Sequence, residues 1–164
     1  MRKVLLSLGS NVGDSRDILK KAVQKLDSFL YNIQVSYLYT TKPLYYSDQD
    51  DFYNICVMGE SDMSPKDFLM ETQNIEKQLG RHRAQQIHPK GPRTLDIDII
   101  LWGNEIINTE NLIVPHMDYI NREFVLKPAI ELDGKIKDPN TNEYLVDILT
   151  RLPDQGVYCL NETL

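Results

Sequence analysis

The sequence predicts an α+β fold of the ferredoxin-like βαββαβ plan, in which helices pack on an antiparallel sheet and a C-terminal extension follows. The first observation is the order of the segments, because strand-like and helix-like periodicities follow one another in that order along the chain. The second is that each predicted helix is preceded by a residue suited to cap it. The predicted strands cover residues 3–8, 33–41, 52–60 and 94–102, and the predicted helices cover residues 15–30 and 65–79.

The two helices follow from their local patterns. Residues 15–30 place apolar side chains every three or four positions, as an amphipathic helix does, and Asp14 precedes them as an N-cap. The second helix has Ser64 as its cap and Pro65 in its first position, and Gly80 ends it.

The strands follow from short apolar or alternating runs. The first run ends at the turn Gly9–Ser10–Asn11, and the fourth covers residues 94–102. In the predicted plan the first and fourth strands are neighbours in the centre of the sheet. The turn is therefore expected to lie near the fourth strand.

The chain after residue 103 is predicted to be less regular. We expect a pair of short strands between residues 104 and 115 and a helix over 122–132 that Pro128 interrupts. A short helix over 145–152 and a polar tail complete the C-terminal extension.

At 164 residues the chain is long enough for one domain with its own core, which we expect to be residues 1–164. The net charge of −6 argues against nucleic acid and membrane surfaces as partners, because both attract an extended basic surface. No apolar run reaches the length of a membrane span. Two cysteines make no disulfide framework, and Cys56 is expected in the core. We expect a monomer in the cytoplasm.

The fourth predicted strand carries two carboxylates in an otherwise apolar segment. Asp96 and Asp98 are two positions apart, so they point to one face of the strand, and the apolar residues around them point to the other. Aspartate is uncommon in strands, and two like charges this close repel unless a cation lies between them. The pair therefore predicts a site for a hard divalent metal such as Mg²⁺. The alternative is a half-buried strand with a solvated polar face.

Residues 81–93, just before this strand, hold four Arg and Lys side chains and no Asp or Glu. A solvated charged surface normally mixes both signs, so this local excess of positive charge in an acidic chain favours an anionic ligand. A basic loop beside two carboxylates predicts a polyphosphate held by Arg and Lys, with Mg²⁺ bridging it to the Asp pair.

Several separated motifs give the chain a resemblance to a known family. They are LSLGSN at residues 6–11, TKPL at 41–44, FYN at 52–54, QLGRHR at 78–83, GPRTLDIDIILWG at 91–103, VPH at 114–116 and NREFVL at 121–126. In this order and spacing they resemble the 6-hydroxymethyl-7,8-dihydropterin pyrophosphokinases of folate biosynthesis. The resemblance implies an enzyme that moves pyrophosphate from ATP to the hydroxymethyl group of 6-hydroxymethyl-7,8-dihydropterin, releases AMP and uses two Mg²⁺ ions.

The resemblance also implies roles for individual residues. Asp96 and Asp98 correspond to the two carboxylates that hold both metal ions, and they are predicted to be catalytic together with Arg83 and Arg93. The residues predicted to bind ATP are Gln73, Glu76, Arg83, Arg93, His116 and Arg122. The residues predicted to bind the pterin are Thr41, Pro43, Leu44, Phe52, Asn54 and Phe124. The two phenylalanines are expected to stack on the ring, and the asparagine to bond its amide edge.

The chain departs from the family pattern in three places. Segment 84–90 is longer than usual and lacks an aromatic residue before Gly91. Tyr45 stands where a glycine is common, and Met117 stands where a tyrosine is common. The first departure leaves open how a loop closes over the pterin.

Other functions stay open at this point. A metal-dependent nucleotidyltransferase or nuclease could also use two Asp residues on a strand, but the acidic charge of the chain opposes it. A non-catalytic module that binds a small ligand has no evident use for the paired carboxylates. The third alternative is a family member that binds ATP and Mg²⁺ but turns over poorly.

Overall fold

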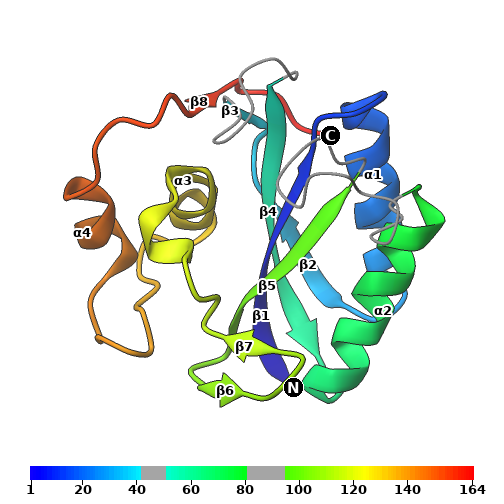
Figure 1. Cartoon of the computed structure of the whole chain (residues 1–164), viewed down its shortest axis with the longest axis horizontal. Coiled ribbons are helices and arrows are strands. Elements are labelled where there is room, and N and C mark those ends of the chain that lie inside the picture. The colour runs from blue at the N-terminus through cyan, green and yellow to red at the C-terminus, as the bar shows by residue number, and fades with distance from the viewer. Residues whose placement is uncertain (42–50, 81–94) are drawn as a thin grey trace.

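The structure is a computed structural model that describes residues 1–41, 51–80 and 95–164. Its centre is an antiparallel sheet with helices on both faces (Figure 1). Within the described residues six strands form this sheet in the order β5-β1-β4-β3-β8, with β2 also paired to β4. The sheet strands are β1 (Arg2–Ser10), β2 (Tyr31–Val35), β3 (Tyr39–Thr41), β4 (Phe52–Ser61), β5 (Asp96–Trp102) and β8 (Tyr158–Cys159). The remaining elements are α1 (Ser15–Leu26), α2 (Pro65–Gln78), the hairpin β6 (Ile107–Asn108) and β7 (Ile113–Val114), the 3₁₀ helix η2 (Tyr119–Asn121), α3 (Glu123–Leu132) and α4 (Leu145–Thr150).

Helices α1 and α2 cover one face of the sheet. Both predicted caps are confirmed, because the Asp14 and Ser64 side chains accept hydrogen bonds from backbone N–H groups in the first turns of α1 and α2. In this core layer Phe68 of α2 contacts Phe29 and Trp102 edge-on, with ring centroids 5.1 and 5.2 Å apart. The two helices and the sheet thus form the predicted ferredoxin-like unit.

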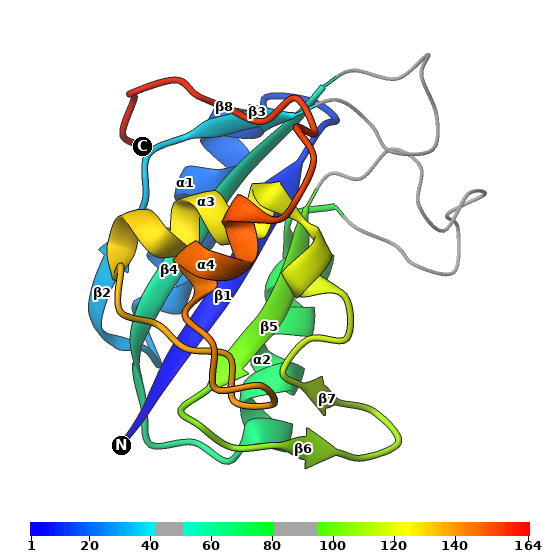
Figure 2. The ribbon, with the colours of Figure 1, turned by 90° about the vertical axis from the view of Figure 1, so that its left-hand side faces the viewer.

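Helices α3 and α4 cover the opposite face, where Figure 2 shows them in front of the strands. Their apolar side chains pack against Leu5 of β1 and against Cys56 and Met58 of β4. Cys56 is fully buried, as predicted. The C-terminal extension is therefore a third layer of the fold. None of the helices in the described part of the chain is long and apolar enough to cross a membrane.

Two of the predicted elements have the wrong bounds. The first helix ends at Leu26 and not at residue 30, and the Ser28 hydroxyl donates to the Lys25 carbonyl just beyond its end. The predicted strand over residues 33–41 is two strands, β2 and β3. Between them the Tyr37 N–H donates to the Glu131 carboxylate of α3 and not to a neighbouring strand.

Pro128 does not interrupt α3, contrary to the prediction. A proline within a helix removes one backbone hydrogen bond and costs about 3 kcal/mol. Here Val125, Leu126 and Ala129 are buried against the sheet, and this burial offsets the loss. The polar tail also contains a strand that the sequence did not predict, since β8 pairs with β3.

Strand β5 is a neighbour of β1, as predicted, but it is not central. Within the described residues β5 is the last strand on its side of the sheet, and β1 and β4 lie inside. Strand β1 continues through Ser10, so Gly9 belongs to the strand and pairs directly with Asp96. The predicted proximity of Gly9 to the Asp strand is confirmed.

Candidate active site

Asp96 and Asp98 lie on the face of the sheet that α3 and α4 cover. Strand β5 pairs with β1 so that Asp96 is opposite Gly9 and Asp98 is opposite Ser7. Both Asp side chains are partly exposed, whereas the isoleucine between them is buried in the core under α1 and α2. The predicted alternation of carboxylates and apolar side chains is therefore confirmed over this stretch.

One row of the sheet joins the Asp pair to a residue predicted to bind the pterin. Gly9 pairs with Asp96 on one side and with Asn54 of β4 on the other, and we call these three residues the Gly9 row. Residues opposite each other in antiparallel strands share a face, so the Asn54 carboxamide and the Asp96 carboxylate project from the same face. Their Cα atoms are two strand spacings, or roughly 10 Å, apart.

The Asn54 carboxamide is suited to receive a ligand. The residue is only 3% exposed, and within the described part of the chain its Nδ2 has no hydrogen-bond partner. Buried amide donors are nearly always paired, and an unpaired one costs about 1–3 kcal/mol. Phe52 lies two positions away on the same face of β4, and Thr41 of β3 is opposite Phe52. Three of the predicted pterin residues thus share a face with the Asp pair.

The start of α3 contributes a ring and a cation. Phe124 is partly buried and packs against the core under α3. The guanidinium carbon of Arg122 lies 5.6 Å from the centroid of the Phe124 ring, and one terminal nitrogen lies 3.5 Å from the Asp118 carboxylate. The Arg122 Nε is buried, and no hydrogen-bond partner for it exists among the described residues. A guanidinium with a buried unpaired donor suits a phosphate oxygen.

His116 lies beside the Asp pair, with its Nε2 4.0 Å from Asp98 Oδ2. Its Nδ1 accepts a hydrogen bond of 3.2 Å from the Asp118 N–H, so the proton of the neutral ring is on the nitrogen that faces Asp98. The His116 backbone N–H donates to the carbonyl of Ile100 at 3.0 Å. Ile100 is the extra residue of β5 at the point where its register with β1 shifts, so it has no partner residue on β1. Its carbonyl instead holds the backbone of His116.

Gln73 and Glu76 are predicted to share a helix face toward ATP, but their surroundings differ. Gln73 is exposed, whereas Glu76 is only 2% exposed. Glu76 Oε2 accepts a hydrogen bond of 2.8 Å from the backbone N–H of Ile97, the residue between the two aspartates. Glu76 thus holds the strand that presents the Asp pair, a role that its helical spacing alone did not indicate.

The comparison with known families agrees with these features. Residues 5–134 match the model of the family described as 7,8-dihydro-6-hydroxymethylpterin-pyrophosphokinase (HPPK). The chain belongs to this family. The family inferred from the separated motifs is confirmed.

Among full-length HPPK relatives, the 2-amino-4-hydroxy-6-hydroxymethyldihydropteridine pyrophosphokinase of Haemophilus influenzae is 36% identical over 158 residues, which cover 95% of this chain and 96% of the relative. The protein of the same name from Bacillus subtilis is 40% identical over 139 residues, with coverage of 84% and 81%. The folic acid synthesis protein fol1 of Pneumocystis carinii is 36% identical over 94% of this chain. The chain spans only 20% of that fungal protein.

Solved HPPK structures share the fold. The crystal structure of wild-type HPPK-DHPS from Plasmodium falciparum matches 92% of this chain with a TM-score of 0.70 and 15% identity. The match covers 44% of the Plasmodium chain. At this identity the likeness concerns the fold alone, and it agrees with the predicted ferredoxin-like plan.

Several predicted HPPK site residues are not tested by the structure. Pro43, Leu44, Arg83 and Arg93 lie outside the described residues, as does the divergent segment 84–90. The binding roles of the described site residues also stay predictions. Sequence reasoning missed Gly9 as part of the site, although a glycine inside an apolar strand is itself a signal of close approach by another group.

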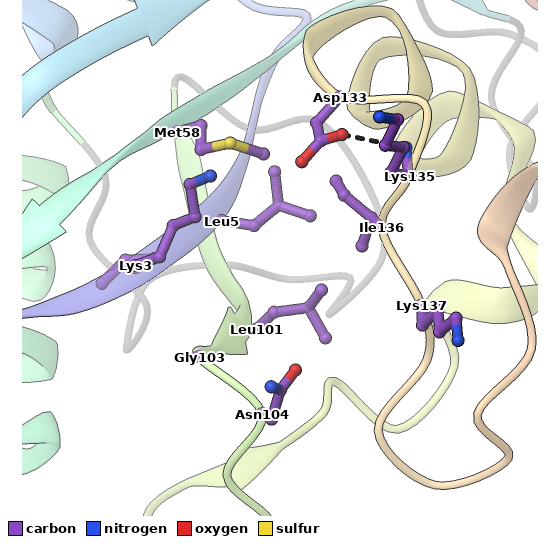
Figure 3. Close-up of a pocket in the computed structure, with 11 residues that line it drawn as sticks. Lys3, Leu5, Met58, Leu101, Gly103, Asn104, Asp133, Lys135, Ile136 and Lys137 are labelled. Atoms are coloured by element: carbon purple, nitrogen blue, oxygen red, sulfur yellow. Dashed lines mark hydrogen bonds between the residues drawn. The ribbon is translucent and has the colours of Figure 1, made fainter.

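A cavity of about 320 Å³ lies away from this candidate site, toward the other end of β1 and β5 (Figure 3). Its floor is apolar and includes Leu5 of β1 and Leu101 of β5, which are opposite each other in the sheet. Leu5 is two residues from Ser7 along β1, and Leu101 is three residues from Asp98 along β5. The charged residues that line it are Lys3, Asp133, Lys135 and Lys137. None of the predicted site residues lines this cavity.

Proposed function

We propose that this chain transfers the pyrophosphoryl group of ATP to the hydroxymethyl oxygen of 6-hydroxymethyl-7,8-dihydropterin, a step of folate biosynthesis, and releases AMP. The observation that carries the proposal is the Gly9 row, in which a carboxylate and a buried, unpaired amide donor project from one face of the sheet. Family membership supports it, as do the names of relatives that match nearly their whole length.

The donor set of the site fits Mg²⁺. Asp96 and Asp98 offer hard carboxylate oxygens from one partly exposed face. Among the described residues no group of three or more His, Cys, Asp or Glu side chains could hold a metal. Mg²⁺ fits such a sparse site, because proteins usually bind it through one or two carboxylates together with water and substrate phosphates. We propose that Asp96 and Asp98 hold two Mg²⁺ ions, which would neutralise phosphate charge on ATP.

The side chains around the Gly9 row would orient the pterin. In the proposed complex Asn54 Nδ2 donates to an acceptor on the edge of the ring, and Phe52 and Phe124 stack on its faces. The hydroxymethyl group then points along the row toward Asp96. This arrangement fixes the direction of attack, which is the main contribution a protein makes to phosphoryl transfer.

The charged side chains at the start of α3 and beside β5 would hold the phosphates. Arg122 offers its buried Nε–H, and His116 offers the N–H that faces Asp98. In the reaction the hydroxymethyl oxygen forms a bond to the β-phosphorus. The bond from the β-phosphorus to the oxygen that stays with AMP breaks, and the hydroxyl proton is released.

Product analysis tests this function. The protein is mixed with Mg²⁺, ATP and 6-hydroxymethyl-7,8-dihydropterin, and AMP, ADP and the pterin product are separated by chromatography. We expect AMP and pterin diphosphate in equal amounts, and no product once EDTA removes the metal. ADP in place of AMP would contradict attack at the β-phosphorus, and an absence of turnover would contradict the proposed activity.

We also propose that residues 1–164 act as one domain and as a monomer with these two small-molecule substrates. The support is that both core layers share one sheet. Light scattering after gel filtration checks the oligomeric state. Location in the cytoplasm stays a prediction from the sequence.

A further inference from the structure

We propose that Gly9 is a positioning residue for the pterin, because the absence of a side chain at residue 9 keeps the Asn54 carboxamide in the orientation that receives the ring. The inference rests on the proposed function, since it assigns the pterin edge to Asn54. It adds a residue that touches neither the metal nor the phosphates. It also explains why a glycine occurs in the middle of a row that joins three strands.

The position of Gly9 gives the first argument. It is flanked by Asn54 on β4 and Asp96 on β5, and all three residues share one face. The neighbouring β1 residue on the same face, Ser7, is only 5% exposed, whereas Gly9 is partly exposed. Gly9 is therefore where this face of β1 opens, between the amide and the carboxylate.

Backbone geometry does not explain the glycine. Gly13 and Gly103 have φ values of 77° and 55°, which favour glycine over other residues, but φ of Gly9 is not positive. A strand interior also disfavours glycine. Glycine loses more conformational entropy on folding than other residues do, and it has no side chain to pack against its neighbours. The reason for Gly9 must therefore lie in what a side chain would touch.

A side chain at residue 9 would touch Asn54. A Cβ atom there would lie 2.9 Å from Asn54 Oδ1, which is closer than carbon and oxygen atoms normally approach. The next nearest atoms are 3.8 and 4.0 Å away, in ordinary van der Waals contact. The carboxamide is thus the one group that must move. Because Asn54 is only 3% exposed, its carboxamide has little room to rotate, and any rotation would redirect the unpaired Nδ2 donor.

A second strand glycine has a different reason and provides a control. A Cβ atom at Gly59 of β4 would lie 2.6 Å from Leu30 Cγ and 2.9 Å from the Tyr31 carbonyl, both away from the Gly9 row. Gly59→Ala should therefore lower stability without changing pterin affinity in the folded protein. Gly9→Ala should instead weaken pterin binding, because its new contact is with Asn54.

A double-mutant cycle tests the proposal. Binding of 6-hydroxymethyl-7,8-dihydropterin is measured in the presence of Mg²⁺ and a non-hydrolysable ATP analogue for the wild type, Gly9→Ala, Asn54→Ala and the double variant. Because the Asn54 hydrogen bond is lost or misdirected, Gly9→Ala and Asn54→Ala should each weaken pterin binding by about 10- to 100-fold. In the Asn54→Ala background Gly9→Ala should change binding by less than about twofold, since its only close contact is gone.

Three further measurements separate this role from a general loss of structure. Affinity for the ATP analogue should stay within about twofold in all four proteins, because a Cβ atom at residue 9 has its closest contacts with Asn54 and Tyr53 and not with Asp96. In the Asn54→Ala background Gly9→Ala should leave thermal stability equal or higher, because it removes the entropic cost of glycine. The KM for the pterin should rise more than kcat falls.

The outcomes distinguish the inference from the function on which it rests. A wild-type protein that makes no pterin diphosphate would overturn the proposed function. A wild-type protein that is active, with Gly9→Ala and Asn54→Ala effects that add fully, would overturn the role of Gly9 alone. Equal losses of pterin and ATP-analogue affinity in Gly9→Ala would overturn it as well.

Discussion

Glu76 of α2 accepts a hydrogen bond of 2.8 Å from the backbone N–H of Ile97, the residue that separates Asp96 from Asp98. Within the described residues β5 has a strand neighbour on one side only, so this bond replaces a ladder hydrogen bond on its other side. The carboxylate is buried, and it couples the helix to the strand that carries the candidate metal ligands. The second helix therefore supports the site by holding its backbone.

This contact predicts a loss of stability in Glu76→Ala. The free energy of unfolding should fall by about 1–3 kcal/mol, because the Ile97 N–H is left buried and unpaired. Glu76→Gln should lose less, since the amide oxygen can still accept. Urea denaturation measures both, and Gln73→Ala on the exposed side of α2 is the matched control. Full stability of Glu76→Ala would show that the bond is dispensable.

Asp98→Ala should abolish most activity and leave the fold intact. We expect turnover to fall by at least about 100-fold, the effect of removing one group that stabilises charge in a transition state. The side chain is 31% exposed, so its removal should leave circular dichroism and melting temperature near wild type. Asp147→Ala on the exposed side of α4 is the control, because it also removes one negative charge but lies outside the candidate site. Unchanged turnover in Asp98→Ala would refute the metal role.

Phe124→Ala should weaken pterin binding by about 1–3 kcal/mol through lost stacking and burial. ATP affinity should be largely kept. Because the ring also packs against the core under α3, some loss of stability is expected as well. Fluorescence titration with each ligand separates the two effects. An equal loss of affinity for both ligands would mean that Phe124 acts only in the core.

Tyr119 predicts a loss of stability at alkaline pH. Burial, and then the hydrogen bond to the Asp138 carboxylate, raise the pKa of this phenol in the folded protein. An unfolded tyrosine ionises near pH 10, so above that pH the unfolded state has lost a proton that the folded state keeps. The contribution of Tyr119 to the free energy of unfolding is therefore complete below about pH 10 and is lost as the pH rises further.

Unfolding in urea as a function of pH checks this sign. Above about pH 10 the free energy of unfolding should fall less steeply with pH in Tyr119→Phe than in the wild type. The difference between the two slopes should be about 1.4 kcal/mol per pH unit, the value for one proton. The variant should also be less stable at neutral pH, because Asp138 loses a hydrogen-bond donor. Equal slopes in the two proteins would contradict the raised pKa.

The sequence by itself determined those features that depend on neighbouring residues. The caps at Asp14 and Ser64, the burial of Cys56 and the shared face of Asp96 and Asp98 follow from periods of two and 3.6 residues and from short capping patterns. These patterns need no knowledge of the rest of the chain. For that reason the βαββαβ order and the paired carboxylates could be read from the sequence.

Only the tertiary structure decided how distant segments meet. The pairing of Asn54, Gly9 and Asp96 depends on the register of three strands, and the bond from Ile97 to Glu76 depends on how α2 packs beside β5. Pro128 stays within a helix because the sheet buries that helix. Register and packing are set by burial shared among elements far apart in the chain, so no local pattern specifies them.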